Sequence, residues 1–119
     1  RDRDLWARYM PIIMALDRAG WEPVTYARTD DPDIWVERFG DTPEEGLHFT
    51  VHNASNEERT FTLAIDVGSL GIDIGEPLVV TELTSGREIP YTLRGNRLQL
   101  TGEIPPQETL VFKIALQRG

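Results

Sequence analysis

The stretch LHFTVHNASNEERTFTLAIDV, residues 47–67, decides the fold class of this chain. Residues 47–52 and 59–67 both alternate apolar and polar side chains, which is the period of a half-buried β-strand. Between them, residues 53–58 are rich in turn-forming types, so we expect a hairpin loop and a firm antiparallel pair of strands. The residues expected to face inward are Leu47, Phe49, Val51, Phe61, Leu63, Ile65 and Val67.

The same alternation recurs on both sides of this stretch. Further candidate strands are 21–29, 34–39, 77–83, 88–93, 97–102 and the end of IPPQETLVFKI, residues 104–114. About eight strands with turns every 8–12 residues or so are typical of an antiparallel sandwich or barrel. The length of 119 residues allows one domain and excludes a TIM barrel, which needs about 250. We therefore expect an all-β fold, an antiparallel β-sandwich of about eight strands over residues 21–119.

The segment before the strands has the period of a helix. In LWARYMPIIMALDRAG, residues 5–20, one face is expected to carry Leu5, Tyr9, Ile12, Ile13 and Leu16. Trp6, Met10 and Met14 form a second apolar strip beside it. Pro11 either kinks the helix or begins its main part. A stripe this wide predicts contact on two sides, so we read residues 1–20 as a helix that also packs against a neighbouring domain.

Composition narrows the class of partner. The net charge is −8, Lys113 is the only lysine, and nine carboxylates lie between Asp30 and Glu58 against the single arginine Arg38. Phosphate backbones and anionic membranes attract clustered Lys and Arg, so neither is an expected partner. The absence of cysteine excludes disulfides and thiolate chemistry. The chain begins Arg1-Asp2-Arg3 without an initiator methionine, which we read as the start of a fragment.

Three marks in order resemble the C-terminal β-domain of multidomain glycoside hydrolases. They are VERFG within GWEPVTYARTDDPDIWVERFG (20–40), TVHN within LHFTVHN (47–53), and the last strand after the prolines of residues 104–114. In such enzymes a helix ends a (β/α)₈ catalytic barrel and the chain then enters a small β-sandwich. The layout is similar to the terminal domains of α-amylase-like and α-galactosidase-like enzymes.

The resemblance implies a non-catalytic accessory sandwich that stabilises or covers the catalytic domain. Residues 1–20 would then be the end of the preceding barrel, and that catalytic domain would be the main partner. These domains usually hold no catalytic residue and no cofactor, so the resemblance carries no catalytic position onto this chain. The bias toward arginine over lysine favours a bacterial source.

Acidic and imidazole side chains offer the usual candidate sites. Glu37 and Glu82 are the least trivial pair of carboxylates for glycoside hydrolysis, but we expect solvated surface. His48 and His52 share one face of a strand, about 13 Å apart at ~3.3 Å per residue, which is too far for one metal ion. Four aspartates could supply oxygen ligands for Ca²⁺: Asp30, Asp31, Asp33 and Asp41. Their spacing matches no EF-hand, so we expect a polar turn there instead. We therefore predict no metal site.

Aromatic side chains are candidates for stacking on sugar rings. Trp35 points opposite to its apolar neighbours and is the best exposed candidate. Tyr26 and Tyr91 are further possible carbohydrate-binding residues. Trp6 and Trp21 are expected to pack in the core at the helix. Asn53-Ala54-Ser55 matches the N-glycosylation pattern within the expected hairpin loop.

Two alternatives to the accessory domain remain open. One is a carbohydrate-binding module that holds polysaccharide through exposed aromatics. The other is an immunoglobulin-like interaction domain in an array of similar sandwiches. A free-standing enzyme is the least favoured, because no nucleophile and base stand out together.

Overall fold

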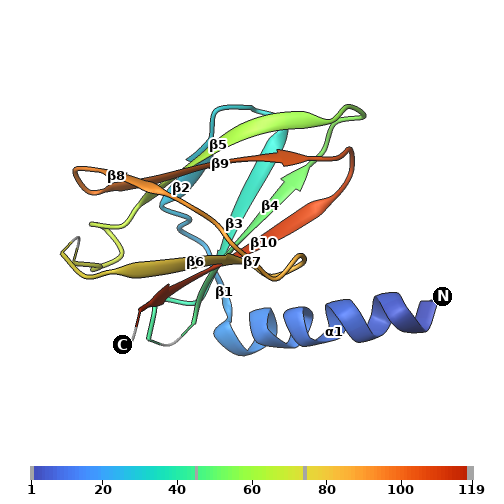
Figure 1. Cartoon of the computed structure of the whole chain (residues 1–119), viewed down its shortest axis with the longest axis horizontal. Coiled ribbons are helices and arrows are strands. Elements are labelled where there is room, and N and C mark those ends of the chain that lie inside the picture. Colours follow the sequence, from blue (N-terminus) through green and yellow to red (C-terminus); the bar gives the residue numbers. More distant parts are fainter. Residues whose placement is uncertain (1, 45, 74, 118–119) are drawn as a thin grey trace.

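The computed structural model describes residues 2–44, 46–73 and 75–117, with the backbone alone for residues 2–6 and 8. Two antiparallel sheets face each other, and one helix, α1 (Asp2–Ala19), precedes them. The helix lies on the outside of one sheet, and its N-terminal end extends past the sheets (Figure 1). The expected all-β, sandwich-like fold with one N-terminal helix is confirmed. No helix among the described residues is long and apolar enough to cross a membrane.

Sheet A carries the helix and sheet B lies opposite. In sheet A the strand order β1–β3–β4–β10–β6–β7 joins Trp21–Glu22, Ile34–Phe39, Leu47–Asn53, Thr109–Leu116, Leu78–Glu82 and Arg87–Glu88. In sheet B the order β2–β5–β9–β8 joins Ala27–Thr29, Arg59–Asp66, Arg97–Ile104 and Thr92–Arg94. The described residues thus form ten strands rather than about eight.

The core lies between the two sheets and consists of alternate residues of their strands. All seven residues expected to face inward from 47–67 are buried, and so are Leu98, Leu100, Phe112 and Ile114. Phe61 of β5 and Phe112 of β10 meet edge to face across the core, with ring centroids 6.3 Å apart. The two-residue period therefore identified the buried faces correctly.

The pairing expected for residues 47–67 is wrong. β4 pairs with β3 and β10 in sheet A, whereas β5 pairs with β2 and β9 in sheet B. Residues 54–58 form an arch that carries the chain from one sheet to the other, not a hairpin loop. Because both strands bury an apolar face in the same core, they satisfy the alternating pattern equally well from opposite sheets.

Two expected strands are each divided between the sheets. Residues 21–29 contain β1 of sheet A and β2 of sheet B, separated by Pro23, which lacks an N–H, and by Tyr26, whose φ is 55°. Residues 88–93 divide in the same way at Pro90, which lies between β7 and β8. In both places the proline ends a strand and the chain changes sheet.

The helix runs through Pro11 without a break, so Pro11 is not its first residue. It ends at Gly20, whose N–H donates to Leu16 O at 2.9 Å and whose φ of 88° suits glycine. Gly40 N–H then donates to Gly20 O at 2.7 Å. A Cβ on Gly40 would lie 1.9 Å from Gly46 O and 3.3 Å from the Cβ of Ala19. Glycine at position 40 therefore lets the end of the helix approach the sheet.

Candidate functional site

The outer face of sheet A is only partly covered by α1. Two hollows lie between the helix and strands β4 and β10 of that face, one of about 480 Å³ beside the middle of the helix and one of about 370 Å³ beside its last turn. The larger is bounded by Tyr9, Ile12, Ile13 and Leu16 and, from the sheet, chiefly by threonines and Val111.

The helix packs on the sheet through part of its apolar stripe, and other side chains of the stripe keep much of their surface exposed. Ile12 and Leu16 are half-buried, whereas Tyr9, Ile13 and Met14 keep 37%, 47% and 51% of their surface. We call Tyr9, Ile13 and Met14 the apolar flank. Leu5 and Trp6, also placed on the stripe by the sequence, lie outside the described side chains. Beyond the helix, Trp21 is 57% exposed, so the expectation that it packs in the core is wrong.

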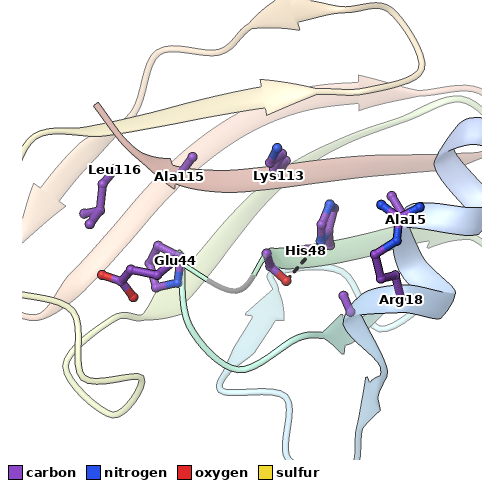
Figure 2. Close-up of a pocket in the computed structure, with 10 residues that line it drawn as sticks. Ala15, Arg18, Glu44, His48, Lys113, Ala115 and Leu116 are labelled. Carbon is purple, nitrogen blue, oxygen red and sulfur yellow. Dashed lines mark hydrogen bonds between the residues drawn. The ribbon is translucent and has the colours of Figure 1, made fainter. Parts of the chain in front are cut away.

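The smaller hollow is basic. Arg18 of the last helical turn, His48 of β4 and Lys113 of β10 line it together with Glu44 (Figure 2). His48 and Lys113 are direct cross-strand partners, so the register brings them together. His48 is 4% exposed, and its Nδ1 donates to Gly46 O at 3.2 Å. Burial lowers the pKa of His48 and Lys113 lowers it further, against an opposing effect of the Gly46 carbonyl.

The three aromatic candidates do not form one platform. Trp35 is 60% exposed on the outer face of sheet A, with its ring centroid 5.9 Å from that of His52. Tyr26 lies 5.4 Å from the guanidinium of Arg38, near the junction of the two sheets. The Tyr91 hydroxyl donates to Leu78 O at 3.0 Å and accepts from Leu78 N–H at 3.2 Å. Tyr91 thus closes the crossing from β7 to β8, and Trp35, at 60%, is more exposed than Tyr26 at 40%.

Glu37 and Glu82 are on opposite faces of sheet A. Glu37 is exposed, whereas Glu82 is 4% exposed at the end of β6. The Glu82 carboxylate accepts hydrogen bonds from Thr84 Oγ1 at 2.6 Å, from Ser85 N–H at 2.9 Å, and from the N–H groups of Thr84 and Val111 at 3.0 Å. Burial raises the pKa of Glu82, but these hydrogen bonds outweigh it and the pKa is lowered. A carboxylate held ionised in this way organises the turn after β6.

The aspartates considered for calcium are engaged by protein groups. Asp31 pairs with Arg59 at 2.7 Å and also accepts from Asp33 N–H at 2.9 Å. Asp30 accepts from Thr62 N–H at 2.9 Å. His52 Nδ1 lies 2.9 Å from Thr109 Oγ1. Within residues 2–44, 46–73 and 75–117 no three His, Cys, Asp or Glu side chains are grouped as metal ligands would be.

Sequence reasoning missed two buried polar residues that position this face. Arg38 is 4% exposed and donates from Nε to Val24 O and from Nη1 to Gly40 O, each at 2.8 Å. It therefore holds both the segment after β1 and the turn that meets the helix. The sequence could have shown that Arg38 is buried, because the alternation of its strand places it on the same inward face as Ile34 and Val36.

The second missed residue is Asn53, which has no exposed surface. Its Nδ2 donates to Glu57 O at 2.8 Å, Ile104 O at 3.0 Å and Pro105 O at 3.2 Å, while its Oδ1 accepts from Ser55. The amide that the glycosylation pattern would modify is thus enclosed by the arch between the sheets.

No protein-family model matches the sequence, and no curated protein matches it.

Proposed function

We propose that this chain is a non-catalytic accessory β-sandwich of a carbohydrate-active enzyme, a glycoside hydrolase, and that it packs against the catalytic domain preceding it in the polypeptide. Its work is mechanical: α1 and the outer face of sheet A form one side of an interface between the domains. The resemblance of residues 20–40 and 47–53 to the junction in such enzymes supports the class of enzyme.

The observation that carries the proposal is the apolar flank, which stays exposed although the helix already packs on sheet A. Fully burying one large apolar side chain stabilises by about 1.5–3 kcal/mol. Tyr9, Ile13 and Met14 are each roughly half exposed, so covering them would contribute about 2–4 kcal/mol. That gain is available only when a second surface meets the helix.

The test compares the 119-residue chain with the longer polypeptide that carries the preceding domain. Ile13→Gln with Met14→Gln should destabilise the 119-residue chain only through the half of each side chain that is already buried in it. In the longer protein the same pair should cost a further ~1.5–3 kcal/mol at the domain interface.

Leu93→Gln is the matched control, because Leu93 is 37% exposed but belongs to β8 of sheet B. It should destabilise the two proteins equally. Equal effects of the helix pair in the short and long proteins would contradict the packing proposal.

A second candidate function rests on Trp35. Its 60% exposure on the helix-bearing face offers a ring for stacking on a sugar. Affinity electrophoresis on several polysaccharides should show retardation that Trp35→Ala abolishes. Migration unchanged on every glycan would remove the binding function and leave the accessory domain.

A further inference from the structure

The basic hollow at the end of α1 stands out in an acidic chain. It brings Arg18 and Lys113, the only lysine, onto either side of His48 (Figure 2). Within the described residues neither cation lies within ion-pair distance of a carboxylate, and the one hydrogen bond to the His48 ring is at Nδ1. Glu44 lines the same hollow without pairing with either.

The charge of the hollow fits one monoanion. Among the described residues that line the hollow, Arg18 and Lys113 contribute two positive charges and Glu44 one negative charge, so their sum is a single positive charge when His48 is neutral. Since Nδ1 of His48 donates to Gly46 O, its Nε2 carries a proton only when the ring is charged. An anion in the hollow would therefore favour the charged imidazolium form of His48.

We propose that this hollow binds a carboxylate group, supplied by an acidic side chain of the domain that packs on the apolar flank. Arg18 presents a planar guanidinium that suits a carboxylate, and Lys113 presents a point charge from the sheet. Arg18 follows Met14 of the apolar flank by one helical turn, so a partner surface that covers Met14 also reaches the hollow. The source of the carboxylate rests on the proposed function, whereas the binding chemistry of the hollow does not.

The binding chemistry is tested on the 119-residue chain with acetate as the probe, at constant ionic strength maintained with chloride. The ring resonances of His48 should shift saturably with acetate, and the pKa of His48 should rise as the site fills. Arg18→Gln with Lys113→Gln should weaken acetate binding about tenfold or more, as expected for lost charge-assisted hydrogen bonds.

Arg28→Gln with Arg94→Gln is the matched control, because both arginines are exposed on sheet B. It should leave acetate binding unchanged. A linear, non-saturating shift, the same shift with chloride alone, or equal weakening by both pairs of variants would overturn the carboxylate site.

The source is tested in the longer polypeptide. There acetate should no longer shift His48, and the pKa of His48 should already be raised, because the partner's carboxylate occupies the hollow. Acetate binding that persists in the longer protein would overturn this source. That result is distinct from failure of the proposed function, which the variants at Ile13 and Met14 measure separately.

Discussion

Replacing Asn53 by alanine removes the side chain that holds the arch between the two sheets. In the native chain one amide nitrogen serves three carbonyl oxygens, those of Glu57, Ile104 and Pro105, at 2.8–3.2 Å. After the substitution, carbonyls that face the buried amide lose their donor. Each buried polar group left without a partner costs about 1–3 kcal/mol, so we expect a loss of about 3–5 kcal/mol.

Urea unfolding of the 119-residue chain, followed by tryptophan fluorescence, measures this loss. Asn56→Ala is the matched control, since Asn56 is an exposed residue of the same arch, and it should cost less than about 0.5 kcal/mol. The reasoning is refuted if Asn53→Ala costs no more than this control. For the same reason, an enzyme that glycosylates the pattern at Asn53 should modify the unfolded chain and leave the folded chain unmodified.

Two further predictions concern buried ionisable groups. Glu82→Gln should destabilise the chain by about 2–3 kcal/mol at pH 7, because the carboxylate accepts charge-assisted hydrogen bonds. Since the pKa of Glu82 is lowered in the folded chain, its carboxylate stabilises the fold above the unfolded pKa. The stability difference between the native chain and Glu82→Gln should therefore vanish as the pH falls through the folded pKa. Urea midpoints whose difference does not depend on pH would contradict this. His48 also has a lowered pKa, so the chain should lose stability as the pH falls below about 6.5. His48→Gln should remove that part of the loss. Identical pH profiles of stability for the native chain and the variant would contradict this role of His48.

The sequence predicted the strands better than it predicted their partners. Residues 34–39 form a strand with the expected bounds, and residues 47–53 and 59–66 agree closely with expectation. Pairing was missed because alternation reports which face is buried and not which neighbour donates the hydrogen bonds. The buried asparagine at the end of β4, followed by a long polar loop, marks an arch rather than the two-residue turn of a tight hairpin.

The candidate site, too, could be predicted from the sequence only in part. The bare side of α1 was predictable, because the width of the apolar stripe in residues 5–16 exceeds what one sheet covers. The basic hollow was not, because Arg18, His48 and Lys113 are far apart in the sequence. They meet only through the register of β4 with β10 and the close approach at Gly40.

Met14 offers the most direct measurement of the central claim, that a neighbouring domain covers the free side of α1. Its side chain is 51% exposed in the described chain and reacts with hydroxyl radicals or peroxide to give a sulfoxide that mass spectrometry quantifies. We predict that Met14 oxidises readily in the 119-residue chain and several-fold more slowly in a longer polypeptide that carries the preceding domain we propose. Equal rates of oxidation in the two proteins would contradict the account.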